Sequence, residues 1–127
     1  MTQSEDCVTT QWTSEEITAR LGISIAVFQK HLFVARDIAI IREAGITRIE
    51  LSCVPRCFDY RNKHQVSEIV SECQKQGVTI VSVHSPFNPP YNLADEKKRK
   101  AVVKESLTAI RFAEEMGASV YVGMTRT

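Results

Sequence analysis

His84 is the side chain in this sequence whose type and position best suit chemistry. It follows the β-branched run 79–83 and precedes the segment 85–88, whose composition is typical of a turn. A neutral imidazole at the end of a strand can bind a metal ion or act as an acid or base. We therefore predict a catalytic or metal-binding role for His84. The alternative is a histidine that is hydrogen-bonded within the strand layer.

Glu50 is the second catalytic candidate. It lies between Ile49 and Leu51 in another predicted strand. An unpaired carboxylate is costly to bury, so Glu50 needs a partner. Two partners are open: Arg48, which has the same strand parity and would form a structural ion pair, or a metal ion or substrate hydroxyl.

Three residues that follow predicted strands are expected to bind substrate. His31 follows the first strand, and Ser85 and Asn88 follow the third. In parallel barrels the substrate lies over the carboxyl ends of the strands, where the following loops gather. For His31 the alternative is an exposed loop position.

A repeating unit along the chain predicts the elements that position these residues. An amphipathic helix, a glycine that can end it and a short β-branched run recur, with Gly45, Gly77 and Gly117 spaced 32 and 40 residues apart. The expected core-facing helix positions are Val34, Ile38 and Ile41; Val66, Ile69, Val70 and Cys73; and Val103, Leu107 and Ile110. The third helix should begin near an Asp95 cap and end at Met116. Helices between strands imply parallel, right-handed crossovers.

The alternation within each strand decides between α/β architectures. The aliphatic parity comprises Ile23, Ile25, Val27, Ile49, Leu51, Val81, Val83, Val120 and Val122. The small or polar parity comprises Ser24, Ala26, Arg48, Glu50, Ser52, Ser82, His84, Tyr121 and Gly123. A doubly wound sheet, covered on both faces, would show continuous apolar runs instead. We therefore predict an α/β fold, a parallel (β/α) TIM-barrel fragment with about four strands and three to four helices. A sheet with one face in water is the alternative.

Length and composition limit the classes of function. The chain has 127 residues, 43% hydrophobic and 24% charged, with a net charge of +1. This balance gives no whole-domain attraction to nucleic acid or to an anionic membrane. No apolar run approaches the roughly 20 residues that span a bilayer, and residues 1–16 lack the pattern of a secretory signal. A soluble, cytoplasmic protein without a membrane partner is expected.

Other motifs point away from several chemistries. Cys7, Cys53, Cys57 and Cys73 lack the paired spacing of zinc sites, so reduced thiols are expected, with Cys73 packed as a small hydrophobe. The chain has no Gly-rich phosphate loop, nucleophile elbow or nucleotide fingerprint.

The basic run 97–100 either binds a phosphate or forms a solvated helix face. At the other end, Thr13 and Glu16 fit a capping box for a short helix through Leu21.

Several segments together resemble the amino-terminal half of the xylose isomerase-like TIM barrel superfamily, which includes sugar phosphate isomerases and epimerases and apurinic endonucleases. The segments are Leu21-Gly22-Ile23-Ser24, Ala44-Gly45-Ile46 to Ile49-Glu50-Leu51, Val83-His84-Ser85-Pro86, Asn92-Leu93-Ala94 and Met116-Gly117-Ala118-Ser119. The likeness covers residues 21–123. It divides the chain into a polar segment, 1–20, and the amino-terminal half of a (β/α)8 barrel, 21–127.

The resemblance implies a divalent-metal enzyme, with Mg²⁺, Mn²⁺ or Zn²⁺, that acts on a small sugar or sugar phosphate. His84 matches a histidine that often contacts metal or substrate in such families, and the acidic ligands from later strands are absent from this chain. In the endonucleases a second histidine is common at the end of the fourth strand, where this chain has Gly123. A sugar isomerase or epimerase is therefore favoured over a DNA repair nuclease, and nucleic acid is not the expected partner.

The predicted strands account for half of a barrel. A complete (β/α)8 barrel needs on the order of 250 residues. We expect either the first part of a longer protein or a half-barrel that pairs with another half as a homodimer. A non-catalytic half-barrel that dimerises is thus a third hypothesis, and the chain alone is expected to be inactive.

Overall fold

The computed structural model describes residues 11–28, 30–86 and 93–124. Its elements, in chain order, are α2 (Ser14–Arg20), β1 (Ile23–Ser24), the 3₁₀ helix η1 (Ile25–Val27), α3 (Ala35–Glu43), β2 (Arg48–Ser52), α4 (Lys63–Gln76), β3 (Thr79–His84), α5 (Glu96–Glu115) and β4 (Val120–Val122). Within these residues, no helix is both long and apolar enough to cross a bilayer.

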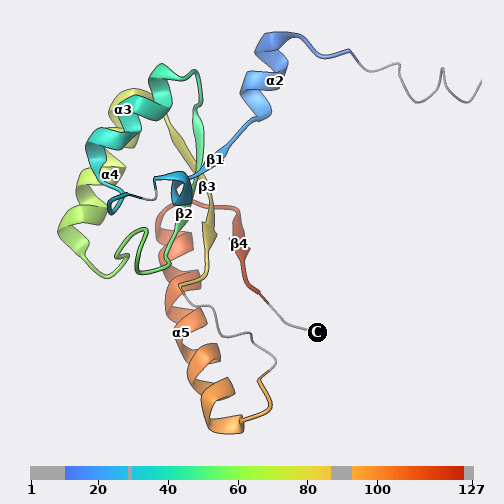
Figure 1. The fold of residues 1–127 in the computed structure, drawn as a ribbon, viewed down its shortest axis with the longest axis vertical. Helices are drawn as coiled ribbons and strands as arrows, with labels where there is room; N and C mark the ends of the chain where they lie inside the picture. The colour runs from blue at the N-terminus through green and yellow to red at the C-terminus, as the bar shows by residue number, and fades with distance from the viewer. Residues whose placement is uncertain (1–10, 29, 87–92, 125–127) are drawn as a thin grey trace, which may run out of the picture.

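The strands form one parallel sheet in the order β1-β2-β3-β4. When each right-handed crossover steps to the next strand in the same direction, all the helices lie on one face of the sheet. Figure 1 shows α3 and α4 side by side next to the strands, with α5 running along β3 and β4. A doubly wound sheet would instead reverse its strand order. The predicted α/β barrel fragment is confirmed.

The helix boundaries follow the predicted caps. Thr13 and Glu16 form the capping box of α2, with a distance of 3.1 Å from the Glu16 amide nitrogen to the Thr13 hydroxyl. The Asp95 carboxylate accepts a hydrogen bond from the Lys98 amide at the start of α5, at 2.8 Å. Gly77 follows α4 with a φ of 70°, the left-handed conformation that only glycine adopts without strain. The sequence therefore specifies where these helices begin and end.

The core lies between the sheet and its helices. Ile49, Leu51 and Val83 on the strands are fully buried, and they pack with Ile38 of α3 and Ile69 of α4. Most of the predicted core positions on α3 and α4 are confirmed, with Ile41 and Cys73 also buried and Val66 and Val70 half-buried. The aliphatic parity of β2 therefore faces the helices, as predicted.

The first and third strands differ from the predicted alternation. The prediction that Val27 faces the helices is wrong, because Val27 is exposed. The Ser24 hydroxyl accepts a hydrogen bond from the Ala26 amide, and the chain leaves β1 there and turns into η1. In β3, Ile80 takes the buried place predicted for Val81. The cause is a register shift opposite Ile49 and Glu50, which makes Val81 an extra residue in the ladder.

The predicted faces of β4 are reversed. Val120 pairs with Ser82 and Val122 with His84, so both valines lie on the polar face of the sheet. Tyr121 pairs with Val83 and packs against the core. The prediction that the valines face the helices is therefore wrong. In a strand of three residues, aliphatic parity alone does not fix the register.

The predicted core stripe of α5 is also wrong. Val103, Leu107 and Ile110 are exposed, and the buried face consists of Val102, Ser106, Ala109, Phe112 and Ala113. Two alanines let the helix approach the sheet, and the Phe112 ring packs edge-on against Phe58 and Tyr60, with ring centroids 6.1 and 5.5 Å apart. Both faces of α5 carry apolar residues, so periodicity could not choose between them.

A polar cluster joins the loop after β2 to α5. The Tyr60 hydroxyl donates a hydrogen bond to the Glu105 carboxylate at 2.7 Å, and Arg61 forms an ion pair with the same carboxylate. The bond from Tyr60, together with the pair to Arg61, holds the pKa of Glu105 below its ordinary value, although partial burial acts in the opposite direction. This cluster fixes α5 against the loop.

The neighbouring valines of α5 test which face is buried. Val102→Ala should lower the free energy of unfolding by about 2 kcal/mol because it removes two buried methyl groups. Val103→Ala, the matched control one residue along, should change it by less than about 0.5 kcal/mol. Urea unfolding measures both. An equal or larger loss at Val103 would show that the exposed stripe is covered.

Glu105 should make stability depend on pH. Its pKa is lowered in the folded protein, so its contribution is present above the unfolded pKa and is lost as the pH falls through the folded pKa. The stability gap between the wild type and Glu105→Gln should therefore shrink between about pH 7 and about pH 3. Urea unfolding across this range measures the gap, and Glu114→Gln on the exposed side of α5 is the control. A gap that is constant with pH would contradict the prediction.

Candidate functional site

His84 ends β3 on the polar face of the sheet. It is half-buried and pairs in register with Ser52 of β2 and Val122 of β4. Its Nδ1 lies 3.0 Å from the Ser85 carbonyl oxygen, which can only accept, so Nδ1 carries the hydrogen. In the neutral ring, the lone pair is then on Nε2. A histidine whose other ring nitrogen is held by a backbone carbonyl is the arrangement typical of a metal ligand or a base.

Glu50 lies on the same face, on the adjacent strand. It pairs in register with Ser24 and Ser82, and its carboxylate accepts a hydrogen bond from the Ser82 hydroxyl at 2.8 Å. Arg48 is exposed and forms no ion pair with Glu50 in the described structure. Since the Ser82 bond uses only one carboxylate oxygen, the other has no partner among the described residues and is free for a ligand.

The register brings the two catalytic candidates together. Glu50 is opposite Ser82, and His84 is opposite Ser52, so the carboxylate and the imidazole lie diagonally across neighbouring strands on one face. Within the described ranges, no group of three or more His, Cys, Asp or Glu residues gathers to hold a metal ion. This part of the chain therefore offers two donor side chains but not a complete metal site.

His31 forms a pair that the sequence did not reveal. Its Nε2 lies 3.1 and 3.0 Å from the two carboxylate oxygens of Asp37, which is only 1% exposed. The same carboxylate accepts a hydrogen bond from the Val34 amide at 3.0 Å and so caps α3. The signal that could have found Asp37 is a charged residue beside the buried Ile38, three positions after the helix cap. No contact of the described residues joins His31 to His84 or Glu50.

Of the two remaining substrate-binding candidates, Ser85 lies within the described structure and is buried there. Ser85 is 1% exposed, and its amide donates a hydrogen bond to the Val122 carbonyl at 2.9 Å. Its hydroxyl has no partner within the described ranges. Asn88 lies outside the described residues. Their roles in binding substrate stay predictions.

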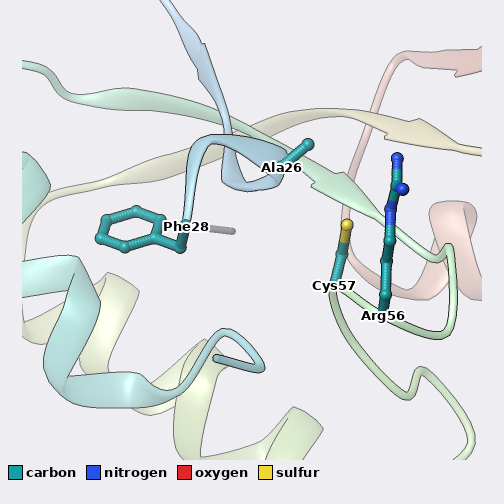
Figure 2. A pocket seen from close by; sticks show the side chains of 4 residues that line it. All are labelled: Ala26, Phe28, Arg56 and Cys57. Atoms are coloured by element: carbon teal, nitrogen blue, oxygen red, sulfur yellow. The ribbon is translucent and has the colours of Figure 1, made fainter. Parts of the chain in front are cut away.

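A pocket of about 260 Å³ lies at the carboxyl ends of β1 and β2. Ala26, Phe28, Arg56 and Cys57 line it. Figure 2 shows the Arg56 and Cys57 side chains extending in the same direction from the loop, with Ala26 nearer to them and the Phe28 ring directed away from them in this view. Sequence reasoning did not single out Arg56, because one arginine in a loop carries no pattern.

Burial disfavours the thiolate form of two cysteines, Cys53 and Cys73. Cys53, Cys57 and Cys73 are free and buried. Burial raises the pKa of Cys53 to about 12 and that of Cys73 to about 11. Both stay protonated at neutral pH, so neither supplies the thiolate that acts as a nucleophile or metal ligand. The predicted packing of Cys73 as a small hydrophobe is confirmed.

The basic run 97–100 is held by local contacts. Arg99 donates a hydrogen bond to the Leu93 carbonyl at 2.9 Å, and Lys100 forms an ion pair with Glu96 one turn earlier, at 3.0 Å. Lys97 and Lys98 are exposed. These contacts favour a solvated helix face over a grip on a phosphate backbone.

Comparison with known proteins agrees with this geometry. Residues 38–126 match the family described as the xylose isomerase-like TIM barrel. The match covers more than half of the chain and includes β2, β3 and β4, so the chain belongs to this family. A search of curated proteins finds no match.

Asp37 should be essential to the local structure around His31. Asp37→Ala should lower the free energy of unfolding by about 1–3 kcal/mol because the Val34 amide and His31 lose a buried acceptor. Glu43→Ala, at the exposed last turn of the same helix, should leave it nearly unchanged. Urea unfolding measures both variants. An equal effect at the two positions would show that the buried carboxylate does not hold this loop.

Proposed function

We propose that this chain supplies part of the active site of a sugar isomerase or epimerase. Membership of the barrel family supports a site at the carboxyl ends of the strands. The observation that carries the proposal is that two groups without a partner among the described residues, Nε2 of the half-buried His84 and one carboxylate oxygen of Glu50, lie on the same sheet face. These are the two kinds of group that move protons in such reactions.

The chemistry is a proton transfer next to a carbonyl. A base removes the proton from the carbon beside the carbonyl, and the C–H electron pair forms a carbon–carbon double bond while the carbonyl π electrons move onto the oxygen, which gives an enediolate. Delivery of that proton to the former carbonyl carbon, with the proton of the adjacent hydroxyl passing to the enediolate oxygen, gives the isomer. Delivery of a proton to the opposite face of the original carbon, with the carbonyl re-formed, gives the epimer. We assign the base to Glu50, since its free oxygen can accept a proton. We assign to Nε2 of His84, which carries the lone pair, the transfer of the hydroxyl proton from one substrate oxygen to the other.

A divalent metal, Mg²⁺, Mn²⁺ or Zn²⁺, is part of the proposal. The imidazole of His84 and the carboxylate of Glu50 are donors that such ions accept, but two donors do not complete a site. When bound, the metal would polarise the substrate carbonyl. The missing ligands would come from further strands, since a barrel of this type has eight and the described residues form four. Completion by a second copy of this chain stays a prediction.

The nuclease hypothesis has weaker support. The fourth strand is followed by the exposed Gly123, not by the histidine common in the endonucleases. Arg99 and Lys100 of the basic run already contact carbonyl or carboxylate oxygens of their own chain. A small sugar or sugar phosphate in the cytoplasm therefore remains the substrate that we propose.

Substitution of His84 or Glu50 should abolish turnover of the sugar substrate. The sample for this test is the protein expressed from the complete reading frame that contains this chain. His84→Ala and Glu50→Gln should each slow exchange of the substrate hydrogen with solvent deuterium by at least about 100-fold. NMR with aldose and ketose substrates, with and without Mg²⁺ or Mn²⁺, measures the exchange. His64→Ala, at an exposed histidine of α4 paired with Glu68, is the control and should exchange normally. Normal exchange in both site variants would refute the proposal.

A further inference from the structure

Arg56 is a cation at the mouth of the half-barrel that has no partner among the described residues. Its side chain lines the 260 Å³ pocket with Ala26, Phe28 and Cys57 (Figure 2). Within the described residues it forms no hydrogen bond or ion pair, in contrast to Arg61 and Arg99. Its charge is therefore available to a ligand that enters the pocket.

The loop that carries Arg56 is firmly anchored. The Cys57 amide donates a hydrogen bond to the Val54 carbonyl at 2.7 Å, and the Cys57 carbonyl accepts one from the Phe33 amide at 2.8 Å. Both bonds involve the residue next to Arg56, and the Cys57 side chain is buried in the core. The backbone under the guanidinium is thus fixed, so little loop ordering opposes binding.

The other walls of the pocket select the kind of ligand. Ala26 and Phe28 supply apolar surface, and the thiol of Cys57 is a poor hydrogen-bonding group. Among the described residues, no carboxylate lines this pocket, so Arg56 is the charged group of its described lining. A planar guanidinium with five donors pairs in a bidentate way with carboxylate or phosphate oxygens.

We propose that Arg56 binds the terminal oxyanion of the sugar substrate, a phosphate ester or a carboxylate. The inference rests on the proposed function, because β1 and β2 end at the same edge of the sheet as β3 with His84. Arg56 is then the residue that restricts the substrate to charged sugars. Neutral sugars of the same length lack the group that the guanidinium pairs with.

Titration of the full chain with three related sugars tests this binding site. The probes are D-ribose 5-phosphate, D-ribonate and D-ribose, followed by NMR at low ionic strength. The phosphate or the carboxylate sugar, or both, should shift amide signals of the loop 54–57, and D-ribose should not. Arg56→Gln should weaken that binding by at least about tenfold, and Arg56→Lys should be intermediate. Comparison of the two anionic sugars distinguishes a phosphate site from a carboxylate site.

The matched control is Arg111→Gln, which removes an equal charge from the exposed C-terminal part of α5. It should bind the probes within about twofold of the wild type, because Arg111 is exposed on α5 and does not line the pocket. Equal weakening by the two glutamine variants, or binding of D-ribose as tight as that of the charged sugars, would overturn the inference.

The inference and the proposed function can fail separately. Exchange by the complete protein with an unchanged KM in Arg56→Gln would refute the role of Arg56 and leave the isomerase intact. Arg56-dependent binding of a charged sugar without any hydrogen exchange would refute the isomerase and leave the oxyanion site intact.

Discussion

The structure depends on the parallel ladder between β2 and β3. This ladder fixes which side chains face the helices and which face the opposite side of the sheet. Ile49 and Leu51 of β2 meet Ile80 and Val83 of β3 on the helix side, and all four are buried. In a sheet covered on only one face, a slip by one residue would exchange the two sets and expose the aliphatic side chains, so register is strongly specified.

The same ladder assembles the candidate site without any dedicated element. Because one face is required for the core, the opposite face is left for Glu50, Ser82 and His84. The bulge at Val81 adjusts the register between Ile49 and Glu50, so that the Ser82 hydroxyl reaches the carboxylate. Bulges are often found next to functional sites, where they re-aim a side chain. The core and the candidate site thus use alternate residues of the same strands.

The sequence predicts those features that depend on local chemistry. We could predict the helix caps at Thr13 and Asp95 and the glycines after the helices, because each of these features has one dominant physical cause. The buried face of β2 could be predicted because aliphatic and polar residues alternate along that strand. Together they were enough to identify the fold class and to place Glu50 and His84 on one face.

The features that the sequence did not predict depend on distant contacts. The buried face of α5 is set by how Phe112 meets Phe58 and Tyr60, which lie far away in the chain. The register of β4 is set by its pairing with β3 and not by its own three residues. Arg56 likewise lines a pocket only because the fold brings the loop after β2 opposite η1. Local patterns contain no information on such contacts.

The hydrogen position on His84 tests the central claim most directly. Long-range proton–nitrogen NMR spectra of the imidazole, recorded at alkaline pH where imidazole side chains are neutral, distinguish the two tautomers. The account predicts the Nδ1–H tautomer, held by the Ser85 carbonyl, with Nε2 unprotonated. An Nε2–H tautomer would mean that the ring does not present its lone pair at the polar face, and it would contradict the site described for His84 and Glu50.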